Sequence, residues 1–212
     1  MRLFVTATNT GVGKTYTTLQ AMQIIRELGL LPGAIKPIET GVTEICEDGS
    51  KLLRKSQDLN QNLKNITIDD VVPYRFRLPA APYVAKGTQT IHIDTILKKI
   101  EELERKCDIL LIEGAGGVMV PIQKGYFMVD LIRDAQAHAL LVTPSRLGSI
   151  NDTLLSQEAL ERRGIGYDWY INLFEDRDSF FEITYPFYKD HFGEVPLDLR
   201  SILQRYANID IA

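Results

Sequence analysis

The sequence predicts a three-layer α/β domain in which helices flank a mostly parallel central sheet. Apolar runs at residues 3–7, 108–112 and 139–143 are typical of strands that are buried on both faces of a parallel sheet. Segments with the 3.6-residue period of a helix alternate with these runs. Alternating strands and helices favour a parallel sheet with helical crossovers.

The stretch from Thr8 to Thr15 reads Thr-Asn-Thr-Gly-Val-Gly-Lys-Thr and joins the first apolar run to a helical pattern beginning at about Lys14. A strand, a small-residue loop and a helix form the context that a phosphate-binding loop, or P-loop, requires. Backbone N–H groups and the helix dipole would face the phosphates, Lys14 would add a charge, and Thr15 would reach magnesium. Thr8 replaces the first glycine of the general motif, and the alternative is a plain glycine turn with an exposed lysine. The flanking pattern favours a P-loop NTPase-like domain.

Composition excludes several classes of protein. The 212 residues fit one domain, residues 1–212, with 45% hydrophobic and 25% charged side chains. The net charge of −4 argues against a nucleic-acid partner. The two cysteines and three histidines show no zinc-ligand spacing. No apolar run approaches the roughly 20 residues of a membrane helix, and a strand by residue 3 leaves no room for a signal peptide. We therefore expect a cytoplasmic protein without a membrane partner.

The first helix is expected over residues 14–28, because an apolar stripe recurs there at helical spacing and Gly29 follows. A short strand, residues 34–36, then ends before Pro37. Lys36 has two interpretations. It is either a lysine that reaches out of the sheet edge or, since strand ends line the ligand crevice of parallel sheets, a second cation beside Lys14.

The next segments are less regular. Residues 50–60 fit a short helix that carries Asp58, a carboxylate to which composition gives no special role. Prolines in residues 79–83 favour an ordered, extended loop. Asp94 is a plausible N-cap of a helix that runs to Lys106.

The apolar run 108–112 ends in Glu113, which is followed by Gly114-Ala115-Gly116-Gly117. An acidic residue at the tip of a buried strand is where P-loop proteins position magnesium. The alternative is a plain glycine turn. With a P-loop on a neighbouring strand, the magnesium site is favoured.

A helix running to about Arg163 follows the apolar run 139–143. Ser149 and Asp152 at its start indicate a well-capped helix, with an anion site as the alternative. Residues 167–174 fit a last core strand that carries Asn172, and the aromatic segment 180–188 is expected to pack in the core. A short amphipathic helix near residues 199–206 follows.

The side chains expected at the carboxyl ends of the strands form a metal–phosphate site. They are Lys14, Thr15, Lys36, Thr40 and Glu113, with Asp58 as a further candidate. Phosphoryl transfer needs positioning and charge compensation more than a nucleophilic side chain. The second lysine indicates a phosphoryl acceptor that is itself anionic.

Several segments, in order along the chain, resemble the dethiobiotin synthetase family of P-loop amide- and urea-forming synthetases. They are residues 7–15, 36–41, 79–82, 113–117 with Pro121, and 147–151. Ala7 departs from the family's leading loop glycine, and Gly11 stands where some members carry an acidic residue.

This resemblance implies an ATP- and Mg²⁺-dependent ligase of biotin biosynthesis. An amine of 7,8-diaminononanoate takes up CO2 as a carbamate, which accepts the γ-phosphate of ATP. The neighbouring amine then closes a cyclic urea and releases phosphate. The family is a homodimer with its active site at the interface.

The resemblance also implies a role for each matching residue. Lys14 and Lys36 would stabilise the carbamate and the moving phosphoryl group, assisted by Thr10 and Thr40. Magnesium would be held by Thr15, Asp58 and Glu113. The nucleotide would contact Gly11, Val12, Gly13, Lys14, Thr15, Asn172 and Pro196. The substrate would contact Thr40, Pro79 and Gly117, and its carboxylate would bind the neighbouring subunit's helix start at Gly148, Ser149, Ile150 and Asn151.

Two alternatives remain at this stage. One is a related synthetase that acts on another small substrate. The other is an ATPase switch of the chromosome-partitioning or division-site type, whose loop usually carries an early lysine where this chain has Asn9. The final predicted helix offers only Arg200 and Arg205, which is a weak membrane-binding surface.

Overall fold

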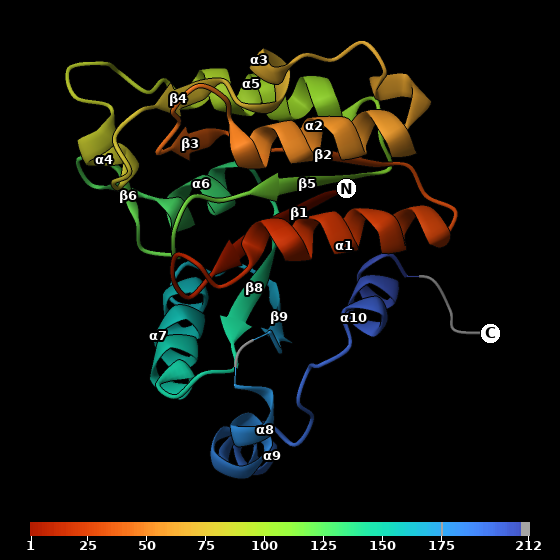
Figure 1. Cartoon of the computed structure of the whole chain (residues 1–212), viewed down its shortest axis with the longest axis vertical. Coiled ribbons are helices and arrows are strands. Elements are labelled where there is room, and N and C mark those ends of the chain that lie inside the picture. Colours follow the sequence, from red (N-terminus) through yellow and green to blue (C-terminus); the bar gives the residue numbers. More distant parts are fainter. Residues whose placement is uncertain (175, 209–212) are drawn as a thin grey trace.

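A five-stranded, fully parallel sheet forms the centre of the computed structural model, which describes residues 1–174 and 176–208 (Figure 1). Glu175 and residues 209–212 of the predicted domain lie outside the described residues. The strand order is β2-β5-β1-β8-β9. The bounds are Arg2–Ala7 for β1, Pro32–Ile35 for β2, Ile109–Glu113 for β5, His138–Pro144 for β8 and Tyr167–Asn172 for β9. The α/β class with a parallel central sheet is confirmed.

The central strands are buried because their sequences are apolar on both faces. Every residue of β5 is buried, and only the first residue of β1 and of β8 is partly exposed. Two small sheets lie outside the central one. They are the parallel pair β3 (Ile38–Thr40) and β4 (Tyr74–Phe76), and the antiparallel pair β6 (Pro121–Gln123) and β7 (Tyr126–Phe127).

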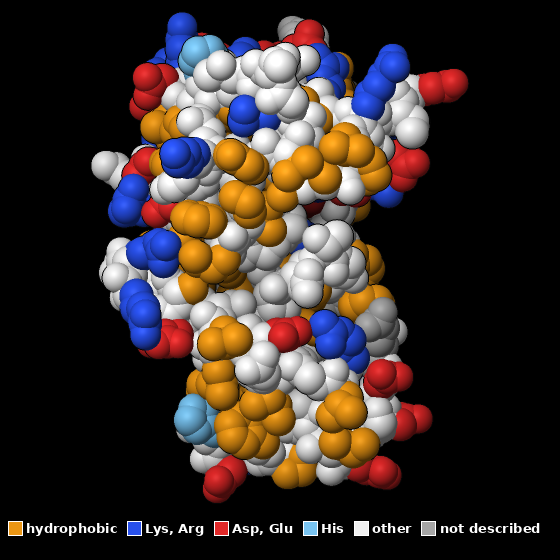
Figure 2. Space-filling view, turned by 90° about the vertical axis from the view of Figure 1, so that its left-hand side faces the viewer, with side chains coloured by type: hydrophobic (Ala, Val, Ile, Leu, Met, Phe, Trp, Pro, Cys, Tyr) orange, Lys and Arg blue, Asp and Glu red, His pale blue; other side chains and the backbone are white. Residues whose placement is uncertain are grey.

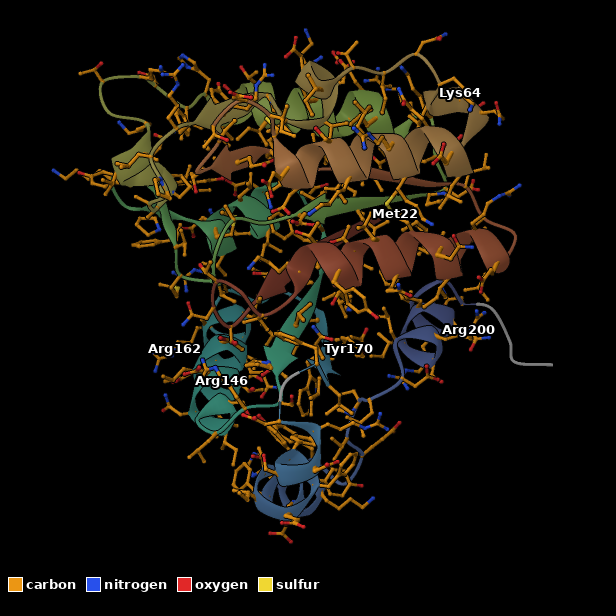
Figure 3. All side chains as sticks on the ribbon, viewed as in Figure 1. Met22, Lys64, Arg146, Arg162, Tyr170 and Arg200 are labelled. Atoms are coloured by element: carbon orange, nitrogen blue, oxygen red, sulfur yellow. The ribbon has the colours of Figure 1, made fainter. Side chains whose placement is uncertain are left out.

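Helices cover both faces of the sheet (Figure 1). The helices of the first half are α1 (Lys14–Glu27), α2 (Glu47–Leu59), η1 (Gln61–Leu63), α3 (Ile68–Val71), α4 (Pro82–Ala85) and α5 (Ile93–Glu104). Those of the second half are α6 (Met128–Asp134), α7 (Ser149–Glu161), α8 (Arg177–Ser179), η2 (Phe180–Thr184), α9 (Tyr185–Phe192) and α10 (Leu199–Tyr206). Helix α1 contacts β1, β2 and β5 and has α2 and α10 as neighbours. Its Met22 is fully buried in the core (Figure 3).

Some local predictions differ from the structure. Helix α2 begins at Glu47, three residues before the predicted start at Ser50. The N-cap of α5 is His92, which places Asp94 inside the first turn, where its charge still suits the helix dipole. In the aromatic segment, Phe180 and Tyr188 are buried as predicted, whereas several other apolar side chains are exposed.

The strand order places three chemically important chain segments side by side. The P-loop follows β1, Lys36 follows β2, and Glu113 ends β5, which lies between those two strands. The carboxyl ends of parallel strands meet at one edge of the sheet, where α/β proteins bind ligands. No helix in the described ranges is both long and apolar enough to span a bilayer.

Candidate functional site

The P-loop has the backbone of an anion-binding loop. Gly11 and Gly13 adopt positive φ angles of 77° and 92°, which only glycine takes up without strain. Helix α1 begins directly after them and has no acidic residue in its first turn to neutralise its positive end. Lys14 folds over the loop, with its Nζ donating to the carbonyl oxygen of Asn9 at 3.0 Å. Burial lowers the pKa of Lys14 to about 8, with the charge of Lys36 acting in the same direction.

The carboxylate of Glu113 is shared by two donors. Its Oε1 accepts hydrogen bonds from Thr15 Oγ1 and from Lys36 Nζ, each at 2.7 Å. Its Oε2 is buried and has no hydrogen-bond partner among the described residues. A buried carboxylate oxygen without a partner is costly, so this atom fits a position next to a bound cation.

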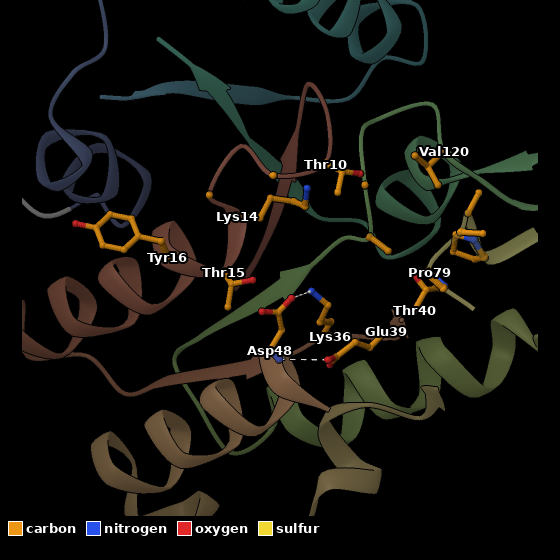
Figure 4. Close-up of a pocket in the computed structure, with 17 residues that line it drawn as sticks. Thr10, Lys14, Thr15, Tyr16, Lys36, Glu39, Thr40, Asp48, Pro79 and Val120 are labelled. Atoms are coloured by element: carbon orange, nitrogen blue, oxygen red, sulfur yellow. Dashed lines mark hydrogen bonds and ion pairs between the residues drawn. The ribbon is translucent and has the colours of Figure 1, made fainter. Parts of the chain in front are cut away.

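A second carboxylate, Asp48, completes the ionic cluster. Its Oδ2 lies 2.7 Å from Lys36 Nζ (Figure 4). Although burial opposes the charged form of Lys36, the carboxylates of Glu113 and Asp48 raise its pKa above the usual range. Lys36 therefore stays protonated and does not reach out to solvent, which decides between the two interpretations of this residue.

Glu39 holds Asp48 in place. The carboxylate of Glu39 accepts the backbone N–H groups of Asp48 at 3.2 Å and of Gly49 at 2.9 Å, and so satisfies the start of α2 (Figure 4). Gly49 permits this close packing, because a Cβ there would lie 2.2 Å from Val72 Cγ2.

These groups surround a pocket of about 660 Å³. Its lining comes from the P-loop and the start of α1, from the segment that follows β2 and from the start of α2. The proline-rich segment that leads into α4, including its first residue, and the loop that follows β5 complete it. The residues are Thr10, Gly11, Gly13, Lys14, Thr15, Tyr16, Lys36, Glu39, Thr40, Asp48, Pro79, Ala80, Ala81, Pro82, Ala115, Gly116 and Val120. Eight residues predicted from the sequence thus meet at one pocket, namely Thr10, Gly11, Gly13, Lys14, Thr15, Lys36, Thr40 and Pro79, and Glu113 joins them through hydrogen bonds.

The structure places Asp58 away from the pocket. Asp58 is exposed and lies in the last turn of α2, whereas the pocket touches the first turn. Ten residues of helix separate Asp58 from Asp48, a distance of about 15 Å along the axis. Asp48 therefore occupies the place beside Lys36 and Thr15 that was assigned to Asp58.

Asn172 and Pro196, which were predicted to contact the nucleotide, lie at the end of β9 and in the segment that pairs with it. Asn172 is buried at the end of β9, and its Nδ2 donates to the carbonyl oxygen of Val12 at 3.0 Å. The carbonyl oxygen of Pro196 accepts the N–H of Ile171, at 3.0 Å. This contact joins the segment before α10 to the end of β9, next to Asn172.

Gly117 has a packing role in the structure. A Cβ at Gly117 would lie 2.8 Å from the carbonyl oxygen of Thr8, so glycine lets the chain after β5 approach the start of the P-loop. The next residue, Val118, donates its N–H to Ala7 at 3.1 Å.

The start of α7 is not capped as predicted. Its N-cap, Gly148, has φ 92° and provides no side-chain cap, while Asp152 pairs with Arg146 at 3.1 Å. Ser149 is buried, Ile150 is half-buried and Asn151 is exposed. None of these first-turn residues lines the pocket of this chain.

Sequence reasoning missed Asp48, Glu39 and Tyr16. The pair Glu47-Asp48 was a usable signal, since acidic residues favour the first turn of a helix. Glu39 gave none, because its partners are backbone groups about ten residues away. Tyr16 lines the pocket and is 57% exposed.

Comparison with known proteins decides the family. A family model described as an AAA domain, AAA_26, matches residues 1–168. The ATP-dependent dethiobiotin synthetase BioD of Sulfurovum sp. is 52% identical over 186 residues, which cover 88% of this chain and 89% of that protein. The protein of the same name from Wolinella succinogenes is 41% identical over 191 residues, covering 89% and 88%. This chain belongs to the dethiobiotin synthetase family.

Similarity to a solved structure supports the fold of this dethiobiotin synthetase family member. The MinC:MinD cell division protein complex of Aquifex aeolicus matches with a TM-score of 0.53 and 16% identity, over 97% of this chain and 86% of that one. At this identity the likeness concerns the fold alone. It therefore adds nothing to the alternative of a division-site switch.

The site of this dethiobiotin synthetase family member can hold a phosphate chain and a hard cation. Among the described residues, no group of three or more His, Cys, Asp and Glu side chains is placed to bind a metal. Two carboxylates, Asp48 and Glu113, and the Thr15 hydroxyl are available instead. This donor set suits Mg²⁺, which keeps several waters and binds through one or two carboxylates plus phosphate oxygens.

Proposed function

We propose that this chain converts 7,8-diaminononanoate, CO2 and ATP into dethiobiotin, ADP and phosphate, as a ligase of biotin biosynthesis. The observation that carries the proposal is the position of Lys36. It stands between Asp48 and Glu113 at the pocket that Lys14 also lines, so the pocket holds a second fixed cation beyond the P-loop lysine. An anionic phosphoryl acceptor such as a carbamate needs such a cation.

The reaction has three steps. One amine of the substrate adds to CO2 and loses a proton, which gives a carbamate. A carbamate oxygen attacks the γ-phosphorus of ATP and ADP leaves, which gives a carbamic-phosphoric anhydride. The neighbouring amine attacks the anhydride carbon, and phosphate leaves as the cyclic urea closes.

The residues of the pocket take the following roles. Lys14 and Lys36 balance charge on the γ-phosphoryl group and the carbamate, and the hydroxyls of Thr10 and Thr40 orient them. The P-loop N–H groups of Gly11, Val12 and Gly13 hold the phosphate chain. Thr15, Asp48 and Glu113 would hold Mg²⁺, which neutralises phosphate charge when bound, and the unpaired Oε2 of Glu113 supports this assignment.

Asn172 and Pro196 are proposed to border the adenine. Their contacts with Val12 and with the end of β9 place them next to the P-loop, which supports this role. Pro79 and Gly117 are proposed to border the diamine.

We further propose that the enzyme is a homodimer that works in the cytoplasm as a single domain. The start of α7, Gly148 to Asn151, would bind the substrate carboxylate in the neighbouring subunit's site. The absence of these residues from the lining of the pocket in their own chain supports this arrangement. Apolar side chains gather on the face that carries α4 and α7 (Figure 2). Exposed examples on or beside these helices are Val84, Leu147 and Leu155, at 55%, 77% and 57%. Sedimentation velocity tests the dimer, and a monomer at all protein concentrations would contradict it.

Phosphate release from Mg-ATP and bicarbonate tests the function, with and without 7,8-diaminononanoate. Release that needs the diamine, yields the cyclic urea by mass spectrometry and disappears in Lys36→Ala is the expected result. Equal release without the diamine, or release stimulated instead by DNA or lipid, would overturn the proposal.

A further inference from the structure

A chain of buried hydroxyl groups connects α9 with the first turn of α7. Tyr188 Oη on α9 donates to Ser149 Oγ at 3.2 Å and lies 3.0 Å from Thr153 Oγ1. Thr153 Oγ1 donates to the carbonyl oxygen of Ser149 at 2.6 Å and lies 2.5 Å from Thr143 Oγ1 on β8. All four side chains are fully buried.

Each hydroxyl group has one proton, and this fixes the direction of the hydrogen bonds in the network. Thr153 has one hydroxyl proton, and the carbonyl oxygen of Ser149 receives it. Thr143 must then donate to Thr153, and Tyr188 donates its single proton to Ser149 Oγ. Ser149 is thereby held through both its side chain and its carbonyl oxygen. Because these groups are buried away from water, the loss of one partner leaves another unsatisfied.

Tyr188 belongs to a different part of the molecule from the rest of this network. With Ile171 and Phe180 it forms a small apolar cluster separate from the main core. Its ring packs on Trp169 and Phe192, with centroids 5.3 Å and 6.1 Å away. Its hydroxyl group reaches the first turn of α7, where Gly148 provides no side-chain cap and Ile150 packs against the same apolar cluster. Tyr188 therefore holds the start of α7, which has no side-chain N-cap.

We infer that Tyr188 is a positioning residue for the carboxylate end of the substrate. By holding Ser149 it sets the direction of the N–H groups in the first turn of α7. This inference rests on the proposed function, in which that turn binds the carboxylate of the diamine in the neighbouring subunit's site. The residue acts through Ser149 and leaves the phosphate end of the site unchanged.

The test compares Tyr188→Phe with Tyr185→Phe in the full-length protein. Tyr185 lies on the same helix and packs on Phe180, but the network does not include its hydroxyl. We expect Tyr188→Phe to raise the KM for 7,8-diaminononanoate about fivefold, the effect of one misplaced hydrogen bond. The kcat and the KM for ATP stay within about twofold of the wild type, and Tyr185→Phe behaves as the wild type.

A substrate without the carboxylate separates positioning from general damage. In 2,3-diaminononane a methyl group replaces the carboxylate of the substrate. We expect Tyr188→Phe and the wild type to have the same kcat/KM for this compound. Thr153→Val, which removes another member of the network at nearly constant volume, is expected to show the same selective rise in KM.

Three results would overturn the inference. The first is an unchanged KM for 7,8-diaminononanoate in Tyr188→Phe, and the second is an equal loss with 2,3-diaminononane or with ATP. The third is failure of both Tyr188→Phe and Thr153→Val to fold, which would assign the network to stability alone. Wild-type protein without diamine-dependent phosphate release would instead reject the proposed function, and this inference with it.

Discussion

The ammonium group of Lys36 lies 2.7 Å from the Oε1 atom of Glu113, and the two residues come from the ends of adjacent strands, β2 and β5. The side chains are 7% and 0% exposed. Removing two charges from water costs about as much as their attraction returns, so such a pair contributes little to stability. Its value lies in fixing a cation at the pocket.

Replacement of one partner of this pair is predicted to destabilise the fold. Lys36→Met leaves the buried carboxylate of Glu113 without its cation, and we expect the free energy of unfolding to fall by about 3–5 kcal/mol. The double variant Lys36→Met/Glu113→Gln is expected to recover most of this loss while remaining inactive. Urea unfolding measures the stabilities and phosphate release measures the activity. Equal stability of the single and double variants would contradict the prediction.

Substitutions of Asp48 and Asp58, at opposite ends of α2, are predicted to differ in their effect on the Mg²⁺ dependence of activity. Asp48→Asn should raise the Mg²⁺ concentration for half-maximal activity at least about tenfold, since it removes one of two carboxylates from the site. Asp58→Asn, at the other end of the same helix, serves as the matched control and should leave the Mg²⁺ dependence unchanged. Magnesium titrations of phosphate release measure both. A larger effect of Asp58→Asn would restore the original sequence-based assignment.

Alanine substitutions at Gly11 and Gly13 of the P-loop are predicted to lower nucleotide affinity to different extents. A Cβ at Gly11 would meet nothing within 4 Å, so Gly11→Ala should cost only the left-handed conformation, about 1–2 kcal/mol. A Cβ at Gly13 would lie 2.2 Å from Nδ2 of Asn172, so Gly13→Ala adds about 1–3 kcal/mol of overpacking and displaces Asn172. Nucleotide affinity should therefore fall further for Gly13→Ala than for Gly11→Ala in isothermal titration calorimetry. The reverse order would exclude the contact between Gly13 and Asn172.

The thiol of Cys107 is predicted to make stability fall at alkaline pH. Burial raises its pKa to about 12, whereas in the unfolded chain it ionises near 9. Between these values the folded protein holds a proton that the unfolded chain releases, so the stabilising contribution is complete below pH 9 and is lost as the pH rises. The slope for one group is about 1.4 kcal/mol per pH unit.

The control for this prediction is Cys107→Ala, which has no thiol to titrate. In urea titrations the unfolding free energy of the wild type should fall relative to that of Cys107→Ala by about 1 kcal/mol from pH 9 to pH 10, because half of the unfolded thiols are already ionised at pH 9. A difference that stays constant over this range would exclude Cys107 as the source.

The sequence predicted the part of the site that strand topology determines. Lys36 and Glu113 stand at the ends of apolar runs, and Lys14 closes the loop that follows a third run. In a parallel sheet such ends meet at one edge. Local pattern and topology therefore agreed, and the three side chains converge on one cluster.

The predictions that failed, for the start of α2 and the cap of α7, concern features that tertiary contacts determine. The start of α2 is fixed by the carboxylate of Glu39, about ten residues earlier in the chain, and the helical period alone placed it three residues too late. Asp48 was consequently left in a presumed loop, and the later carboxylate Asp58 took its role. Likewise, Ser149 and Asp152 had the spacing of a capping box, yet Arg146 and Tyr188 bind these side chains in the folded protein.

The strand order also has a consequence for synthesis of the protein on the ribosome. Strand β5 lies between β2 and β1, so the two strands made first form their ladders with a strand made much later. A nascent chain that ends with α5 carries the P-loop and Lys36 but lacks the strand that joins them. Until Glu113 has emerged, the apolar strands β1 and β2 lack the strand that pairs with both of them, so they stay unpaired for longer during synthesis than neighbouring strands made in succession would.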